Sequence, residues 1–353
     1  MGLSSAIDGL KDARAMAIKG KGGVSSISDI ARLAGVSAST VSRALAGSKM
    51  ISSETRARIT DLAREHGFQL NQMARSLRLK RANAIGIVFP LRHDVVQLVS
   101  DPFFITMLGH VADGVTARGY DLILTRVVPT DSLWLSALVN SGRVDGVIVI
   151  GQSDQEEVLA RVAADYRPLV VWGERHDEQA YCSVGTDNVA GGAMAARHLL
   201  EAGRRRILFA GHAAVPEIAA RYRGYLDAHR EAGVDPADVM PASLTADGAY
   251  AQFAEHLASN DAPDGIVAAS DVIAVAAVRA LGDRGLAVPG DVSVVGYDDV
   301  PLAAQVSPAL TTIRQDLRKG AEHLVDRLFR RLGGEACDPA VMRPELVVRQ
   351  SAP

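Results

Sequence analysis

The apolar positions along the chain change their spacing once, near residue 84. Before that point they recur three and four residues apart in short stretches, which predicts amphipathic helices. After it, short runs of β-branched and apolar residues alternate with longer stretches of helical spacing. The pattern therefore predicts a small helical unit followed by a larger unit in which strands and helices alternate.

The small unit has readable helix starts. Ser26 is expected to be the N-cap of a first helix, with Asp29 completing a capping box, and Gly35 ends that helix. Ser37 and Ser52 are expected to cap a second and a third helix. Two helices joined by a turn with glycine, and a third helix that braces them, are typical of a helix-turn-helix.

The second helix carries little apolar bulk, in the stretch "AGVSASTVSRALAG". If Val41 and Leu45 face the third helix, the outward positions are small or hydroxylated apart from one arginine: Ala38, Ser39, Ser42 and Arg43. Small residues let a helix backbone approach the base edges of the DNA major groove, and an arginine there can bind guanine. An ordinary three-helix bundle with a solvated face is the alternative.

The segment between residues 71 and 79 predicts a short helix in which Leu77 is flanked by Arg75 and Arg78. Such a leucine suits a wedge in the DNA minor groove, which bends the duplex. The alternative is a charged interdomain linker with one incidental leucine.

Charge is divided unevenly along the chain. Residues 25–83 contain ten Lys and Arg against four Asp and Glu, whereas residues 84–353 contain 24 against 35. A basic unit joined to an acidic one favours a polyanion as the partner of the basic unit.

Residues 1–24 are broken by charge and glycine, so we expect a flexible extension and not a signal peptide. No apolar run approaches the roughly 20 residues that span a bilayer, so we expect a cytoplasmic protein without a membrane partner.

The larger unit has an α/β pattern. The expected strands are Ile85–Phe89, Asp121–Thr125, Val144–Ile150, Leu169–Trp172, Ile207–Ala210, Gly265–Ala269 and Val292–Tyr297. The expected helices include Ala190–Glu201, Ile218–Ala232, Ala249–Ser259 and Val272–Arg284. This alternation predicts two doubly wound lobes of parallel sheet, with a ligand at the carboxyl ends of the strands, in a cleft that can close.

Catalytic motifs are missing from the sequence. It contains no dinucleotide-binding or phosphate-binding glycine loop, no nucleophile elbow and no metalloprotease motif, and Cys182 and Cys337 are too few for a metal cluster. We therefore expect no enzyme, cofactor or metal. A Rossmann-type enzyme is an alternative that the absent phosphate loop disfavours. A sugar-binding module without a DNA function is another, which the basic unit disfavours.

The run from "ISDIARLAGVSASTVSRALAG" to "NQMARSL" resembles the lactose-repressor (LacI/GalR) family of bacterial transcription regulators. The resemblance implies a hinge helix that orders on operator DNA and inserts a leucine from each partner. Its phosphate contacts match Ser26, Ser37, Thr40 and Ser42. Its operator-reading positions match Ala38, Ser39 and Arg43. Its hinge positions match Asn71, Ala74, Arg75, Leu77 and Arg78. Leu70 departs from a usual proline before the hinge, and Ala46 departs from a usual asparagine.

The larger unit resembles the same family through "SDPFF", "GRVDGVIVIG" and "VPGDVSVVGYDD". The implied fold is that of periplasmic sugar-binding proteins, with three chain crossings between the lobes. Its N-lobe would contain residues 84–185 and 315–337, and its C-lobe residues 186–314 and 338–353. The crossings would lie near Thr186, Thr311–Gln315 and Cys337–Ala340.

The effector positions that the resemblance implies are Phe104, Arg221, Tyr250, Asp271 and Asp298. Arginine grips hydroxyls or carboxylates, aspartates accept hydrogen bonds from sugar hydroxyls, and aromatic rings stack on the ligand. The alternatives are a surface arginine, aspartates that cap a helix or turn, and aromatic rings of the core. Glu174 stands where relatives often carry arginine, and "SDPFF" is similar to a subgroup that responds to glucosides and maltose-type sugars.

We therefore expect a homodimeric repressor that binds a pseudo-palindromic operator in double-stranded DNA, and is nucleoid-associated when bound. A sugar inducer would lower its operator affinity. The alternative is a purine or other corepressor that strengthens DNA binding. No heptad zipper follows Arg349, which favours a dimer over a tetramer.

Overall fold

A computed structural model describes most of the chain, in two compact units, Met1–Lys80 and Arg81–Pro353. The described residues are 26–45, 47–48, 50–68, 81–91, 97–176, 179–237 and 239–353. The expected extension over residues 1–24, Ala46, Leu70 and the hinge residues Asn71, Ala74, Arg75, Leu77 and Arg78 lie outside them. No helix among the described residues is both long and apolar enough to cross a membrane.

The smaller unit contains the expected helix-turn-helix. Its helices are α2 (Ile27–Ala34), α3 (Ala38–Leu45) and α4 (Ser53–Glu65). The Ser26 hydroxyl accepts a hydrogen bond from the Asp29 backbone N–H at 3.2 Å, and the Asp29 carboxylate accepts one from the Ser26 N–H. Ile30, Val41 and Ile59, one from each helix, are fully buried in a common core. These contacts fix the angle at which α3 leaves the turn.

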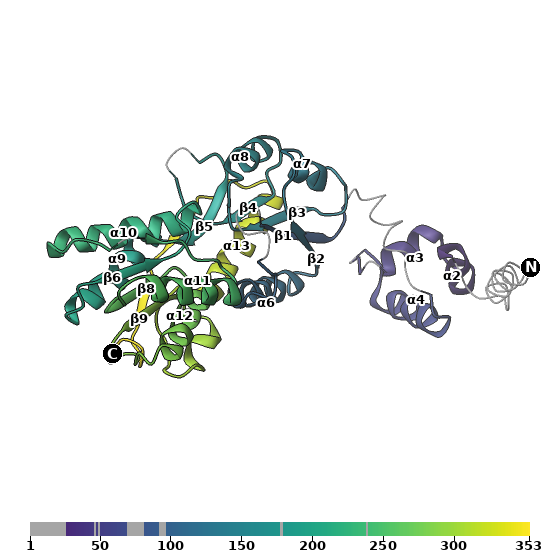
Figure 1. Cartoon of the computed structure of the whole chain (residues 1–353). Helices are drawn as coiled ribbons and strands as arrows, with labels where there is room; N and C mark the ends of the chain where they lie inside the picture. The colour runs from purple at the N-terminus through teal and green to yellow at the C-terminus, as the bar shows by residue number, and fades with distance from the viewer. Residues whose placement is uncertain are drawn as a thin grey trace, which may run out of the picture. The chain divides into compact units, whose positions relative to one another are not determined.

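The N-lobe of the larger unit is built on a parallel sheet in the order β11-β5-β4-β3-β1-β2 (Figure 1). The strands are β1 (Ala84–Pro90), β2 (Asp121–Val127), β3 (Gly146–Ile150), β4 (Leu169–Trp172), β5 (Cys182–Thr186) and β11 (Ala340–Met342). The helices are α6 (Pro102–Thr116), α7 (Trp134–Val139), α8 (Glu156–Asp165) and α13 (Leu317–Leu332).

Successive side chains of the N-lobe strands pack on opposite faces of the sheet. Val147 and Val149 of β3 pack in the core with α7 and α8, whereas Ile148 and Ile150 pack with α6 and α13. Both faces are therefore buried, which explains why the central strands are continuous apolar runs and do not alternate with polar residues.

The C-lobe sheet has the order β12-β10-β9-β8-β6-β7, with β12 antiparallel to β10 and the other pairs parallel. Its strands are β6 (Ile207–Ala210), β7 (Val239–Met240), β8 (Gly265–Ala268), β9 (Ser293–Asp298), β10 (Thr311–Arg314) and β12 (Glu345–Val347). Its helices are α9 (Asn188–Glu201), α10 (Pro216–Ala232), α11 (Ala246–Ser259) and α12 (Asp271–Asp283), with a 3-10 turn, η1 (Pro301–Ala304). In Figure 1, α9 and α10 cover one face and α11 and α12 the other.

The chain passes three times between the lobes, and two crossings lie where we expected them. The first follows β5 at Thr186, and the second lies between β10 and α13, at Gln315. The expectation for the third was wrong by a few residues. β11 pairs with β5 of the N-lobe sheet, so the chain crosses after Met342 and not over Cys337–Ala340.

All seven expected strands are present, but five further strands were not predicted: β5, β7, β10, β11 and β12. They are short or carry polar residues such as Thr311 and Thr312, whose apolar signal is weak. The neighbouring strands of the sheet stabilise them.

Two glycines bring the backbones of α9 and α10 into direct contact. A Cβ on Gly192 of α9 would overlap the carbonyl oxygen of Arg221, and a Cβ on Gly224 of α10 would overlap that of Val189. The contact fixes the rotation of α10 and therefore the direction in which Arg221 leaves it.

We predict that Gly192→Ala lowers the free energy of unfolding of the larger unit by about 1–3 kcal/mol, because the added methyl group forces the two helices apart. The matched control is Gly282→Ala in α12, where a Cβ meets nothing within 4 Å. Both tryptophans, Trp134 and Trp172, lie in the larger unit, so urea unfolding followed by tryptophan fluorescence measures it. Equal urea midpoints for the two variants would contradict the prediction.

Candidate functional site

The first candidate site is the outer face of α3. Ser37, Ala38, Ser39 and Arg43 are exposed, and Thr40 and Ser42 are half-buried. The Ser37 hydroxyl lies 2.8 Å from the hydroxyls of both Ser39 and Thr40. Among the described residues, the Arg43 guanidinium has no hydrogen bond or ion pair. The outer face of α3 therefore presents clustered hydroxyls and a methyl group at its start and an arginine in its last turn.

Two arginines of α4 hold the loops that position α3. The Arg58 guanidinium donates to the carbonyl of Ala34, at the end of α2, at 3.0 Å. Arg56 donates to the carbonyls of Ser48 and Ile51, which follow α3, at 2.8 and 2.9 Å. These guanidinium groups support the fold of the unit, which leaves Arg43 as the arginine of α3 that faces outward. Ser26 is exposed beside the start of α2.

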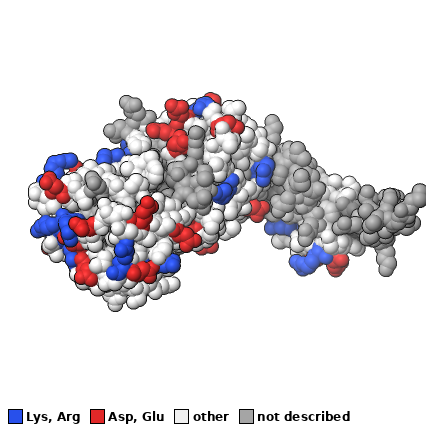
Figure 2. Space-filling model, viewed as in Figure 1, with Lys and Arg blue, Asp and Glu red and all other residues white. Residues whose placement is uncertain are grey.

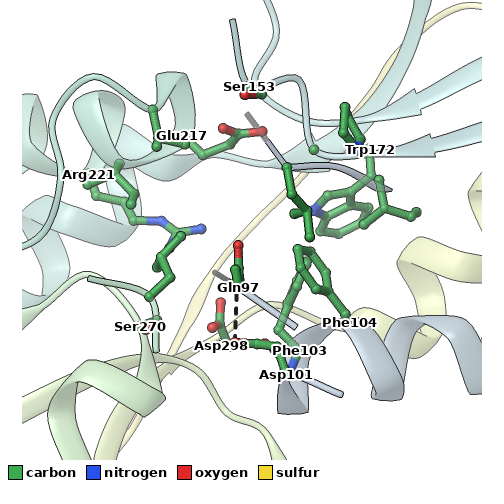
Figure 3. A pocket seen from close by; sticks show the side chains of 17 residues that line it. Gln97, Asp101, Phe103, Phe104, Ser153, Trp172, Glu217, Arg221, Ser270 and Asp298 are labelled. Atoms are coloured by element: carbon green, nitrogen blue, oxygen red, sulfur yellow. Dashed lines mark hydrogen bonds between the residues drawn. The ribbon is translucent and has the colours of Figure 1, made fainter. Parts of the chain in front are cut away.

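The second candidate site is a cleft between the two lobes of the larger unit, with about 660 Å³ of space that no atom fills, part of it open to solvent. Both lobes line it at the carboxyl ends of their strands, as we expected from the α/β pattern (Figure 3). Its polar lining residues are Gln97, Asp101, Ser153, Glu217, Arg221, Ser270 and Asp298.

Aromatic rings of the N-lobe form one wall of the cleft. Phe103 and Phe104 begin α6, and Trp172 ends β4. The ring of Phe103 lies 5.6 Å from that of Phe104 and 6.3 Å from that of Trp172, between centroids. Figure 3 shows these rings across the cleft from Arg221. A flat apolar face of a ligand could stack on this wall.

Arg221 of α10 reaches into the cleft from the opposite wall, although only 8% of the residue is exposed. Its Nε donates to the Asn188 side chain at 2.9 Å and its Nη1 to the Ala269 carbonyl at 2.5 Å. The guanidinium carbon lies 3.7 Å from the centre of the Tyr297 ring. These contacts hold the guanidinium group in place at the wall of the cleft.

Two aspartates, one from each lobe, line the cleft near Arg221. Burial raises the pKa of Asp298 from 3.8 to about 7, although the Arg221 charge and a hydrogen bond from Gln315 at 2.7 Å act to lower it. Burial also raises the pKa of Asp101, whose charge further raises that of Asp298. The carboxylates of these two groups are therefore poorly solvated, and groups that donate hydrogen bonds to them would stabilise their charged forms.

Sequence reasoning placed Phe104, Arg221 and Asp298 in a ligand site, and the structure brings these three together in the cleft lining. Tyr250 and Asp271 do not line the cleft, and that part of the expectation needs correction. Tyr250 lies on α11 at the surface, where its hydroxyl donates to Asp283 at 2.7 Å and Arg279 covers its ring.

Asp271 is only 1% exposed and serves the turn after β9. Its carboxylate accepts hydrogen bonds from the Val300 N–H at 2.9 Å and the Thr312 hydroxyl at 2.6 Å. Burial and the neighbouring Asp298 charge raise its pKa well above 3.8. Both carboxylate oxygens accept hydrogen bonds within the C-lobe, so Asp271 fits the alternative in which it caps a turn.

Four prominent lining residues were missed from the sequence: Gln97, Asp101, Trp172 and Glu217. Asp101 lies inside "SDPFF", and Trp172 ends an expected strand, so both carried a signal. Gln97 and Glu217 lie beside the cleft only because the two lobes face each other. The Gln97 amide donates to Asp101 at 3.4 Å, and its buried Oε1 has no partner among the described residues.

Acidic and basic side chains are interspersed over the face of the larger unit seen in Figure 2. No group of three or more His, Cys, Asp and Glu side chains among the described residues could hold a metal ion. Among the described residues that line the cleft, Arg221 is the one basic side chain.

Comparison with known proteins matches both units. Residues 26–71 match bacterial regulatory proteins of the lacI family, and residues 196–352 match a periplasmic binding protein-like domain. The HTH-type transcriptional repressor PurR of Pectobacterium carotovorum subsp. carotovorum (strain PC1) is 31% identical over 346 residues, or 93% of this chain and 97% of that protein.

Two solved structures share the fold over most of the chain. The lac repressor dimer bound to operator and the anti-inducer ONPF has a TM-score of 0.82 at 25% identity, over 93% of this chain and 98% of that one. A complex of the transcriptional regulator CelR with cellobiose has a TM-score of 0.67 at 29% identity, over 93% of this chain and all of that one. Because a repressor 31% identical matches 93% of the chain, the protein belongs to the lacI family of bacterial regulators: it is a DNA-binding transcriptional repressor with an effector-binding domain, and not an enzyme.

Proposed function

We propose that the protein works as a homodimer that binds a pseudo-palindromic operator, and that a saccharide in the interlobe cleft acts as its inducer. Arg43 would read guanine in the major groove, and the hydroxyls of Ser37, Thr40 and Ser42 would bind phosphates. The twofold symmetry of the dimer would be matched by the two half-sites of the operator. The lac repressor dimer bound to operator, which shares this fold, supports the dimeric arrangement.

The observation that carries the effector proposal is the pairing of an aromatic wall with hydrogen-bond acceptors across one cleft. The carboxylates of Asp101 and Asp298 and the side-chain Oε1 of Gln97 can all accept hydrogen bonds from sugar hydroxyls, while Arg221 donates to a sugar oxygen. The apolar face of a sugar ring would stack on Phe103 or Trp172. The similarity to the CelR complex with cellobiose supports a saccharide.

A purine corepressor is the second candidate, favoured by the similarity to PurR. A purine could also stack on the aromatic wall and donate to the carboxylates. The two candidates predict opposite signs of coupling, because an inducer weakens operator binding and a corepressor strengthens it. By linkage, operator DNA must change the effector affinity by the same factor, typically about 5- to 150-fold.

The deciding experiment is fluorescence-anisotropy binding to DNA from the region upstream of the gene, with cellobiose, maltose, guanine and hypoxanthine added in turn. We expect tight, salt-dependent binding that one of the sugars weakens. Strengthened binding with a purine would establish the second candidate. Specific binding that none of the four compounds changes would contradict the saccharide proposal in this form.

We predict that Arg43→Ala weakens operator binding by about 5- to 150-fold for each recognition helix, because it removes a bidentate contact to a base. The same substitution should change affinity for random DNA much less. Arg64→Ala is the matched control, since Arg64 of α4 is exposed and pairs with Asp61 of the same helix at 3.1 Å. An equal loss on operator and random DNA would assign Arg43 to a phosphate instead.

We predict that Asp298→Asn stabilises the protein at pH 8 but impairs its response to the effector. The folded-state pKa of Asp298 is raised from 3.8 to about 7, so between these pH values the folded protein binds a proton at Asp298 that the unfolded chain does not. This group's contribution to the free energy of unfolding is therefore full below pH 4 and is lost as the pH rises through about 7. Urea midpoints at pH 5 and pH 8 measure it. Asparagine should remove this pH dependence, and an unchanged pH dependence would contradict the prediction.

A further inference from the structure

Glu174 makes a hydrogen bond from the N-lobe to the first helix of the C-lobe. It follows β4, and its Oε2 accepts a hydrogen bond from the Asn188 side-chain amide at 2.6 Å. Asn188 is the first residue of α9 and is only 2% exposed. The bond therefore joins the two lobes beside the first chain crossing.

The other end of the Asn188 amide holds Arg221. The Asn188 Oδ1 accepts hydrogen bonds from the Arg221 Nε at 2.9 Å and from the Tyr297 hydroxyl at 3.2 Å. With two donors aimed at this side, the oxygen must face Arg221 and the NH₂ group must face Glu174. An acceptor at Glu174 satisfies the buried NH₂ group and so maintains the amide orientation that Arg221 requires.

The backbone of Glu174 is held rigidly in the N-lobe. The Gln152 amide donates to the Glu174 carbonyl at 2.7 Å and to the Tyr181 hydroxyl at 2.7 Å. A Cβ on Gly173 would overlap the Gln152 side chain, and one on Gly185 would overlap the Gly173 carbonyl. These close contacts fix the backbone at Glu174 relative to the N-lobe, and so limit the positions that its carboxylate can take.

The charges around the Glu174 carboxylate come from both lobes. Burial raises its pKa, and the nearby Glu217 charge from α10 raises it further. The hydrogen bond from Asn188 and the charges of Arg223 and His176 act in the opposite direction. An arginine at this position would present only donors and could not accept from the Asn188 amide.

We propose that Glu174 is a positioning residue for Arg221, acting through Asn188, so that the separation of the lobes sets the orientation of the arginine in the cleft. When the lobes move apart at this point, Asn188 loses its acceptor and the restraint on the Arg221 Nε is weakened. An effector that Arg221 binds would, in turn, favour the lobe arrangement that keeps the relay intact. This last consequence rests on the proposed function of the cleft, whereas the relay itself does not.

The test is NMR of the full-length protein labelled with ¹⁵N-arginine, without DNA or effector. The Arg221 Nε–H signal is assigned by its loss in Arg221→Lys. We expect it to exchange slowly with water in the wild type, and at least about tenfold faster in Glu174→Ala, because a hydrogen bond to a charged group is lost from the relay. Glu174→Gln keeps an acceptor oxygen and should restore slow exchange.

Glu201→Ala, which removes an exposed carboxylate at the end of α9, is the matched control and should leave the signal unchanged. If Glu174→Ala fails to fold, Glu174→Met keeps the side-chain volume while it removes the acceptor, and it should show the same fast exchange. Unchanged exchange in the variant without the acceptor would overturn the relay. Equal loss of protection in Glu174→Gln would also overturn it, because an acceptor would then be insufficient.

The result is independent of the identity of the effector. Fast exchange in Glu174→Ala supports the relay even if no sugar binds in the cleft. Conversely, a sugar that releases operator DNA supports the proposed function even if the relay fails. The two proposals can therefore fail separately.

Discussion

The guanidinium of Arg221 is almost wholly removed from bulk water, and a buried charge is stable only where fixed dipoles and opposite charge replace its hydration. Asn188 of α9, the Ala269 carbonyl after β8, and the Tyr297 ring and Asp298 carboxylate at the end of β9 supply that replacement from three elements. The requirement ties the carboxyl end of the C-lobe sheet to the helix pair that covers it. The backbone contact between α9 and α10 at Gly192 and Gly224 makes the arrangement possible, because no side chain separates the two helices there.

Asp298, in the lining of the same cleft, is held in an unfavourable backbone conformation and a poorly solvated environment. Asp298 has a φ of 116°, a conformation that is costly for a residue other than glycine, and its carboxylate is poorly solvated. A site that only stabilised the fold would gain from replacing such a group. Asp298 lies in the same cleft lining as Asp101 of the other lobe. A ligand that donated hydrogen bonds to both carboxylates, as we propose for the effector, would gain free energy from both lobes at once.

The N-terminal unit works by different physics. Its apolar core is small, and arginines of α4 bind the loops on both sides of α3 through backbone carbonyls. The helix itself is short and carries hydroxyl groups that hydrogen-bond among themselves in the absence of DNA. If these hydroxyls bind DNA phosphates, as we propose, one set of hydrogen bonds replaces another and the net cost is small.

The sequence by itself determined the helix-turn-helix, the outward face of α3 and seven strands of the two sheets, because capping residues, glycine turns and apolar runs are local signals. The resemblance to the lactose-repressor family also indicated Phe104, Arg221 and Asp298. Only the tertiary structure decided the five short strands, whose stability comes from their neighbours, and the third crossing, which depends on the pairing of β11 with β5. It alone separated Tyr250 and Asp271 from the cleft, brought Gln97 and Glu217 to its lining, and placed Glu174 against Asn188. Those residues belong to different lobes, and the distance between groups far apart in sequence is set by packing and not by any local pattern.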